Sequence, residues 1–449
     1  MALSKLGLRV IEEANNLKRT KKALAEELNI KPSYLEKIIN GKCNLKEKQD
    51  FIKMMLKKYP IDKTKLENLE SEPFHSFTIL DKNTSKNSAR IFKRKNGLGR
   101  INDYYEYRDT AMNKYSPIYP EWIKPLVIVN NNNPRNRLVC YNKGHLLHQF
   151  TFFIGEVNFY WKDDLGYHCK VMNTGDSNYI PPFVPHSFSS RNKNKLGLII
   201  AVTFADILRF SRSKFTNYTK KNIEEFSGKK NSKFSYFYLF IKDFINKNFL
   251  DENSLIEKML LNGINKKTAK NIINGKKTPS NHQINKLSKV FSIPYSTLKT
   301  MIANETSKVI NKKFALSSKK RIFKDKISFN VWYLAKSNYD NFLNTFIMEV
   351  DAETKKYEVF HQMHEYVFNY SESEIILKIS NKMYVLKPEE SAIINPHIKH
   401  YFYTKENVKS ARLLIIRVGE EFSQDFIHMY AGLSESSRRR IFAEVSQWF

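Results

Sequence analysis

The chain has 449 residues and carries 75 Lys and Arg against 45 Asp and Glu, a formal net charge of +30 that first suggests a polyanionic partner such as nucleic acid. Apolar residues make up 41% and aromatic residues 13%, which excludes a disordered chain and a small disulfide scaffold. Its three cysteines are too sparse for a disulfide framework, so we expect a reducing compartment and a cytoplasmic location.

The N-terminal region predicts a helical unit. Residues 17–42 read as helix, tight turn and helix, and end at the motif IINGK (38–42). The same motif returns at 272–276, after a similar helical pattern that begins at 254. The pattern resembles the helix-turn-helix of phage-repressor-like regulators. Ser33 and Ser280 are the helix N-caps that we expect near these turns.

Each helical region is followed by short, alternating, β-branched and aromatic runs separated by Gly and Pro, which predict antiparallel strands in a jelly-roll barrel. The most apolar run, 196–204, is too short to span a bilayer, so no membrane partner is expected. We therefore predict an α+β fold in which a helix-turn-helix-like unit followed by a cupin barrel occurs twice. The predicted ranges are 1–75 (helical), 76–235 (catalytic cupin), 236–320 (helical) and 321–449 (second, non-catalytic cupin).

Residues with metal-ligand spacing lie in the first predicted barrel. His145 and Gln149 are four residues apart just before a strand, and His186 follows in PPFVPHSF (181–188). Two imidazoles and one oxygen donor on one face suit a non-haem Fe(II) centre with open positions. A neutral amide leaves such a site one charge more positive than a carboxylate would, which favours an anionic substrate. The alternative is a set of ordinary polar residues at a barrel mouth.

The order of helix-turn-helix and cupin, together with DYYEY (103–107), YNKGH (141–145) and PPFVPH (181–186), resembles the phosphonate oxygenases. This family comprises hydroxypropylphosphonate epoxidases, hydroxyethylphosphonate dioxygenases and methylphosphonate synthases. The resemblance implies iron ligation by His145 and His186, and it puts Gln149 where the epoxidases have a carboxylate ligand. The acidic ligand of the dioxygenases falls on Ile180, which cannot bind metal. Gln and Ile at these two places are the pattern of the synthases, so both positions are expected to set specificity.

Further contacts are implied by the resemblance alone. The family has a catalytic lysine from the helical unit and a catalytic tyrosine, whose counterparts are Lys18 and Tyr107. Its substrate-binding tyrosine, arginine and asparagine have the counterparts Tyr105, Arg100 and Asn142. The alternative to a catalytic role is that the lysine is a solvated residue on its helix. The alternative for the two tyrosines is that they are aromatic residues packed on a strand.

The second predicted barrel repeats the ligand spacing with His361, Glu365 and His400. The family carries one iron per chain, in the first barrel, so we interpret this set as a vestigial site, with a second metal site as the alternative. The family also has a lysine from the second barrel, and spacing does not choose between Lys399 and Lys405.

The function implied by the resemblance is an Fe(II)- and O2-dependent cleavage of the C–C bond of 2-hydroxyethylphosphonate to methylphosphonate and bicarbonate. The enzyme would hold one Fe(II) per chain, use O2 as co-substrate, and need neither 2-oxoglutarate nor NAD(P)H. A first alternative is a dioxygenase that forms hydroxymethylphosphonate and formate.

A second alternative is a helix-turn-helix cupin transcription regulator, which the charge of +30 supports. The predicted recognition helix at 31–40 has two lysines, Glu36 and no arginine, which argues against DNA as a partner. The sequence is compatible with a homo-oligomer.

Overall fold

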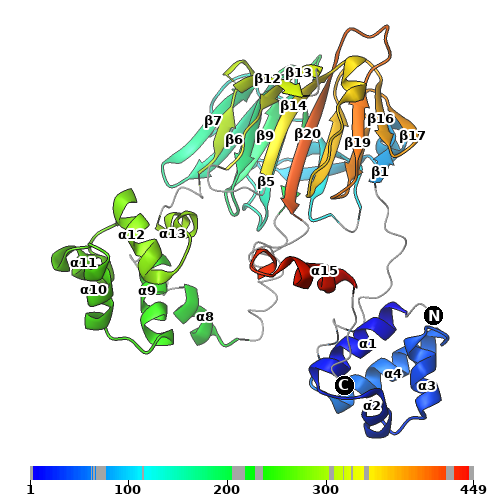
Figure 1. Ribbon diagram of the computed structural model, residues 1–449. Coiled ribbons are helices and arrows are strands. Elements are labelled where there is room, and N and C mark those ends of the chain that lie inside the picture. The colour runs from blue at the N-terminus through cyan, green and yellow to red at the C-terminus, as the bar shows by residue number, and fades with distance from the viewer. Residues whose placement is uncertain are drawn as a thin grey trace. The chain divides into compact units, whose positions relative to one another are not determined.

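The computed structural model describes residues 4–61, 63, 66, 77–113, 116–204, 218–227, 236–302, 308–316, 318–324, 327–337, 343–420 and 429–443 (Figure 1). The chain divides into two compact units, residues 1–75 with 422–449, and residues 76–421. Within the described ranges, no helix combines the length and apolar character needed to cross a membrane.

The first unit contains the predicted N-terminal helices. They are α1 (Lys5–Asn16), α2 (Lys21–Glu27), α3 (Pro32–Ile39) and α4 (Leu45–Lys58), and the unit also holds α15 (Glu435–Ala443). Apolar side chains spaced three or four apart on α1, α3 and α4, such as Val10, Ile38 and Phe51, form its core. The predicted cap at Ser33 is wrong: Lys31 precedes the helix, and Pro32 opens it because proline lacks the N–H that a first turn leaves unpaired.

The second set of helices belongs to residues 76–421. It consists of α8 (Lys220–Ser227), α9 (Tyr236–Lys247), α10 (Glu252–Leu261), α11 (Lys266–Ile273), α12 (Asn281–Phe291) and α13 (Tyr295–Ile302). The predicted cap at Ser280 is confirmed, and it forms a capping box with Gln283.

The two IINGK motifs have the same local structure. Each ends a helix, α3 or α11, with Asn40 or Asn274 as the C-cap. The glycine that follows is left-handed in both, with φ of 70° at Gly41 and 68° at Gly275, which is the usual way to end a helix. The motif is therefore a repeated helix terminus, while the repetition of the whole helical unit stays a prediction.

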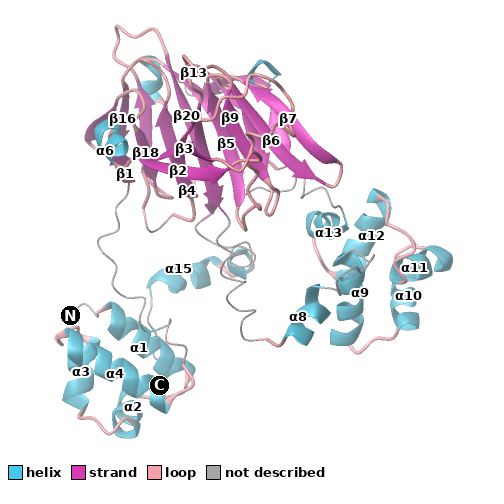
Figure 2. Cartoon of the chain, turned by 180° about the vertical axis from the view of Figure 1, so that it is seen from behind, coloured by secondary structure: helices cyan, strands magenta, loops and turns pink. Residues whose placement is uncertain are grey.

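Two barrels of antiparallel strands account for the sheet content, as expected for an α+β fold (Figure 2). The first contains β2 (Arg90–Lys95), β3 (Ile101–Asp109), β4 (Tyr119–Pro125), β5 (His148–Ile154), β6 (Val157–Asp163), β7 (Gly166–Met172), β8 (Ser177–Ile180), β9 (His186–Ser190) and β10 (Leu198–Phe204). The second contains β12 (Ser318–Lys324), β13 (Ile327–Tyr333), β14 (Leu343–Val350), β15 (Met363–Asn369), β16 (Ile375–Ile379), β17 (Lys382–Leu386), β18 (Ser391–Ile394), β19 (His400–Tyr403) and β20 (Ala411–Glu420). Short helical segments α6 (Lys82–Asn87), η2 (Phe314–Leu316) and η3 (Glu353–Lys356) lie between strands.

The two barrels have the same topology and exchange one strand each. The large sheets run β11-β8-β5-β10-β4-β3-β2 and β1-β18-β15-β20-β14-β13-β12, and the small sheets run β7-β6-β9 and β17-β16-β19. Strand β1 (Phe77–Leu80) precedes the first barrel but pairs with β18 of the second. Strand β11 (Ile310–Lys312) precedes the second barrel but pairs with β8 of the first. The exchange crosses the range boundaries that we placed by sequence, and the four-part division itself stays a prediction.

The large sheets of the two barrels share a core. Trp122, Phe152 and Ile200 of the first barrel pack in one cluster with Tyr366 and Ile416 of the second. The opposite faces of the same strands line two separate barrel interiors. Strands buried on both faces explain why 198–204 is a continuous apolar run and not an alternating one.

Matching hydrogen bonds cross this interface. The backbone N–H of Ala335 donates to Ser177 Oγ at 2.9 Å, and that of Ala111 donates to Ser391 Oγ at 2.8 Å. Because Ser177 and Ser391 begin the equivalent strands β8 and β18, the two contacts are counterparts. Each joins a strand that receives an exchanged strand, β8 or β18, to the other barrel.

Replacement of Phe152 by alanine tests the shared core. Phe152 is 0% exposed, and removal of its ring should destabilise the chain by about 3–5 kcal/mol through lost contacts and a residual cavity. Leu165→Ala is the control, because Leu165 is 90% exposed and should change stability by less than about 0.5 kcal/mol. Denaturant unfolding measures both, and equal midpoints would contradict a structural role for the interface.

Candidate metal centre

The structure brings His145, Gln149 and His186 together in the first barrel. His145 lies in the loop before β5, Gln149 is the second residue of β5, and His186 is the first residue of β9. Nε2 of His145 is 3.0 Å from Oε1 of Gln149. The two imidazole rings are perpendicular, with centroids 5.2 Å apart. Three donor side chains therefore converge on one point of the barrel interior.

Backbone carbonyls select the metal-binding form of both histidines. Nδ1 of His145 is 2.7 Å from the carbonyl oxygen of Leu147, and Nδ1 of His186 is 2.8 Å from that of Val184. A carbonyl oxygen can only accept, so each Nδ1 carries the proton and each Nε2 keeps its lone pair for the centre.

The amide of Gln149 is oriented in the same sense. Its Nε2 donates to Thr151 Oγ1 at 2.9 Å, which leaves Oε1 facing His145. The lone pairs of an imidazole nitrogen and an amide oxygen thus meet at 3.0 Å, an arrangement that a cation between them stabilises. These residues fit a divalent metal ion held by two nitrogens and one neutral oxygen.

Burial supports this ligand set. Gln149 and His186 are 5% and 4% exposed. Burial, together with the charges of His145 and Arg94, lowers the pKa of His186 to about 3, so its imidazole stays neutral, as a metal ligand must.

Ile180 is the direct neighbour of Gln149. The register of β5 and β8 places Gln149 opposite Ile180, and the isoleucine side chain is fully buried in the barrel core. The two residues singled out by sequence therefore occupy one cross-strand pair. Ile180 offers no oxygen to the centre and presents an apolar wall beside the amide ligand.

Asn142 holds the loop that carries His145. Its Oδ1 accepts from the backbone N–H groups of Gly144 and His186, at 3.0 and 2.8 Å. Its Nδ2 donates to Nε2 of His186 at 3.1 Å, so this amide occupies the lone pair that a metal ion would take. A Cβ on Gly144 would approach the Phe183 carbonyl carbon to 2.4 Å, so only glycine permits this close approach.

The two tyrosines differ in their surroundings. The Tyr105 hydroxyl accepts from the backbone N–H of Phe188 at 2.9 Å and shares a 3.2 Å hydrogen bond with Ser187, so it is built into the wall. Tyr107 is half-buried and its ring centroid is 5.7 Å from that of Tyr105. Burial raises the pKa of Tyr107, so its phenol keeps its proton and can donate.

Arg100 does not join this group, whereas Arg94 does. Arg100 is exposed in the turn between β2 and β3. Arg94, on β2, donates to the carbonyl oxygen of Cys140 at 2.7 Å, and its guanidinium carbon is 5.5 Å from the Tyr105 ring centroid. Arg94 also lies close enough for its charge to lower the pKa of His186. Sequence reasoning missed Arg94, because a register shift between Phe92 and Lys93 breaks the alternation that would have placed it.

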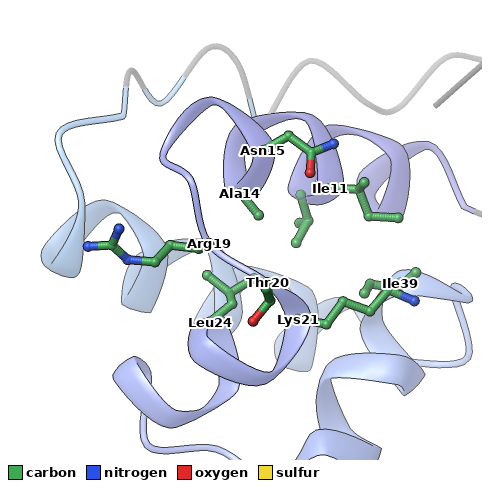
Figure 3. A pocket seen from close by; sticks show the side chains of 9 residues that line it. Ile11, Ala14, Asn15, Arg19, Thr20, Lys21, Leu24 and Ile39 are labelled. Carbon is green, nitrogen blue, oxygen red and sulfur yellow. The ribbon is translucent and has the colours of Figure 1, made fainter. Parts of the chain in front are cut away.

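Lys18 belongs to the other compact unit, which the structure describes separately. It is exposed and follows α1 in a left-handed conformation, with φ of 58°, where glycine is usual. Figure 3 shows the hollow lined by neighbouring Asn15, Arg19 and Thr20, whose volume of about 10 Å³ holds one water molecule and no substrate.

The second barrel also brings its three predicted residues together, but with an added cation. Nε2 of His361 and of His400 lie 2.9 and 3.0 Å from the Glu365 carboxylate. Nε of Arg417 donates to the same carboxylate at 2.5 Å. The two candidate lysines of this barrel form ion pairs at its surface: Lys399 pairs with Glu358 and Lys405 with Glu374, each at 3.0 Å, and both lysines are exposed.

Comparisons with known proteins agree with the resemblance. The chain is 29% identical over 449 residues to the methylphosphonate synthase of Nitrosopumilus maritimus (strain SCM1), covering 97% of this chain and 93% of that protein. It is 31% identical over 104 residues to the (S)-2-hydroxypropylphosphonic acid epoxidase of Streptomyces wedmorensis, covering 23% of this chain and 50% of the epoxidase. No protein-family model matches.

Among solved structures, the fold is similar to that of Streptomyces albus HEPD, a 2-hydroxyethylphosphonate dioxygenase, with 2-hydroxyethylphosphonate and Fe(II) bound. The TM-score is 0.81 at 22% identity, covering 99% of this chain and 98% of that chain. The mixed helical and antiparallel-sheet architecture predicted from the sequence is confirmed.

Metal content distinguishes the two barrels. After anaerobic reconstitution with Fe(II), we expect one ion per chain, and loss of that ion in His145→Ala and His186→Ala, because each removes one of three ligands. His361→Ala is the matched control in the second barrel and should keep the ion. Elemental analysis of the purified variants measures the iron content. Loss of iron from His361→Ala alone would show that the ion binds in the second barrel.

Proposed function

We propose that this chain, similar over almost its full length to methylphosphonate synthase, is an Fe(II)- and O2-dependent phosphonate oxygenase that makes methylphosphonate. Its reaction converts 2-hydroxyethylphosphonate and O2 to methylphosphonate and bicarbonate, with the substrate itself supplying all four electrons. For that reason neither 2-oxoglutarate nor NAD(P)H takes part. The observation that carries the proposal is the cross-strand pair of Gln149 and Ile180 beside two metal-binding histidines.

One Fe(II), held by His145, Gln149 and His186, would supply the activation of O2 and of the substrate's hydroxyl-bearing carbon. The neutral amide of Gln149 leaves the two positive charges of such an ion uncompensated by protein. A phosphonate dianion restores the balance, so the ligand set itself favours this class of substrate.

Arg94 is the cation that we assign to the phosphonate, in the role that sequence reasoning gave to Arg100. A half-buried guanidinium presents a planar fork of donors to a tetrahedral dianion and cannot lose its charge. Asn142 adds an amide donor beside His186, and Tyr107 adds a protonated phenol. Together they orient the substrate so that its hydroxyl end faces the metal ligands.

Lys18 completes the proposed machinery as a catalytic lysine, supplied by its own chain or by a second copy. Its turn, strained for a lysine, is the feature of unit 1 that favours the role. The free thiols of Cys43, Cys140 and Cys169 suit the cytoplasmic location that we propose.

DNA is not the partner that we assign to the helices. On α3, the predicted recognition helix, Lys37 pairs with Glu47 at 2.6 Å and Glu36 pairs with Lys21 at 3.0 Å. One of the two lysines of this helix is thus neutralised, which lowers the positive charge that it could offer to a phosphate backbone.

Product analysis tests the reaction. Reduced, Fe(II)-loaded chain with 2-hydroxyethylphosphonate is exposed to O2, and we expect a methylphosphonate signal by ³¹P NMR, because Ile180 adds no carboxylate ligand beside Gln149. Samples without O2 or without Fe(II) are the controls. Hydroxymethylphosphonate as the sole product would favour the dioxygenase instead, and unchanged substrate would reject both.

Separate replacement of Arg94 and of Arg100 by glutamine tests the phosphonate contact. Arg94→Gln should raise KM by about 10- to 100-fold, since a charge-assisted hydrogen bond contributes roughly 1.5–3 kcal/mol. Arg100→Gln is the matched control and should leave KM within about twofold. Steady-state O2 consumption gives KM, iron content confirms that both variants hold metal, and a larger effect at Arg100 would return the role to that residue.

A further inference from the structure

The two barrels match residue by residue around their centres. Gln149 of β5 lies opposite Ile180 of β8 and Thr203 of β10. Glu365 of β15 lies opposite Ile394 of β18 and Arg417 of β20 in the same way. The pair Gln149 and Thr203 in the first barrel therefore corresponds to Glu365 and Arg417 in the second.

The loops around both centres also correspond. Phe183 and His397 are left-handed, with φ of 63° and 61°, and their backbone N–H groups donate to the carbonyl oxygens of His145 and His361 at 2.8 and 2.9 Å. His400 Nδ1 lies 2.8 Å from the Ile398 carbonyl oxygen, as His186 does from Val184. The second barrel thus keeps the scaffold of a two-histidine, one-oxygen site.

Arg417 takes the place of a positive ion in that scaffold. Glu365 is 0% exposed, and burial alone would raise its pKa, but the charges of Arg417 and His400 and the histidine hydrogen bonds hold the pKa well below its ordinary range. A buried carboxylate needs a positive partner, and the guanidinium at 2.5 Å supplies it. A metal ion would have to displace this contact.

The position of the ring proton on His361 also differs from that on its counterpart, His145, in a way that disfavours metal binding. The atom facing its Nδ1 is the backbone N–H of Met363, at 3.3 Å, whereas the first barrel offers the carbonyl oxygen of Leu147 to His145. Nδ1 of His361 therefore accepts, and its Nε2 carries the proton that it donates to Glu365. Arg417 and His361 both donate hydrogen bonds to Oε2 of Glu365.

Space for further ligands lies next to Arg417. A cavity of about 140 Å³ is lined by Arg417 with apolar side chains that include Phe346, Val359 and Ile415. Because the guanidinium separates this cavity from the Glu365 carboxylate that it pairs with, removal of the arginine side chain would extend the cavity toward Glu365.

We propose that the second barrel is a divalent-metal site that Arg417 keeps closed, so that His361, Glu365 and His400 bind an ion when the guanidinium is removed. The matching residue of the first barrel, Thr203, shows what replaces the arginine without disturbing the strand. The proposal concerns ligation alone and stands apart from the phosphonate reaction.

The experiment uses full-length chain in which His145→Ala and His186→Ala empty the first barrel. In this background we expect no Co(II) bound per chain with Arg417 present, and one Co(II) per chain after Arg417→Thr. Equilibrium dialysis gives the stoichiometry, and the visible spectrum of Co(II) reports nitrogen ligation. One Co(II) bound with Arg417 present, or none bound by a folded Arg417→Thr chain, would overturn the proposal.

Two further variants keep the test decisive. Addition of His361→Ala to Arg417→Thr should abolish Co(II) binding if the ion sits on the predicted ligands; retained binding would contradict the site. Because Arg417→Thr leaves Glu365 buried without the guanidinium that pairs with it, that chain should be less stable, and Co(II) should raise its Tm. Arg417→Thr with Glu365→Leu removes both charges and the oxygen ligand, and it should fold without such a rise, whereas an equal rise would show that the ion binds elsewhere.

Discussion

The packing of two large sheets against each other is the constraint on which the rest of this structure depends. Each sheet turns one face to its own barrel and the other to the shared core, where Trp122 and Phe152 meet Tyr366 and Ile416. A strand buried on both faces cannot shift its register by one residue without moving a whole row of side chains. The positions of Gln149 opposite Ile180, and of Glu365 opposite Arg417, are fixed by this packing.

On that common scaffold, the charge at one pair of positions separates the two centres. In the first barrel the oxygen donor is a neutral amide and its neighbour on β10 is Thr203, so this cross-strand pair carries no charge of its own. In the second barrel the donor is a carboxylate and its neighbour is an arginine, so the charge is balanced within the protein. Both centres have two histidines at matching positions, and the residues at this cross-strand pair set the charge of each centre.

The sequence predicted the parts of the site that depend on local order. His145, Gln149 and His186 were found because ligand spacing along the chain survives folding, and the barrel repeat was found because strand patterns and the IINGK motif recur. Arg94 was missed because a hairpin separates it from the tyrosines, and spacing across a turn does not say which arginine faces inward. Arg417 was missed because 52 residues separate it from Glu365, and only the β15–β20 register brings them together. The Lys18 assignment stays a prediction.

The strand exchange determines when each large sheet can be completed during synthesis of the chain. The first barrel presents residues 90–204 early, yet the edge strand beside β8 is supplied by residues 310–312, after the second set of helices. Until those residues emerge, the edge next to Ile180 has unpaired backbone groups. Strand β1 is made first and waits for β18, more than three hundred residues later. Each barrel therefore completes its large sheet only with a strand from the other half of the chain.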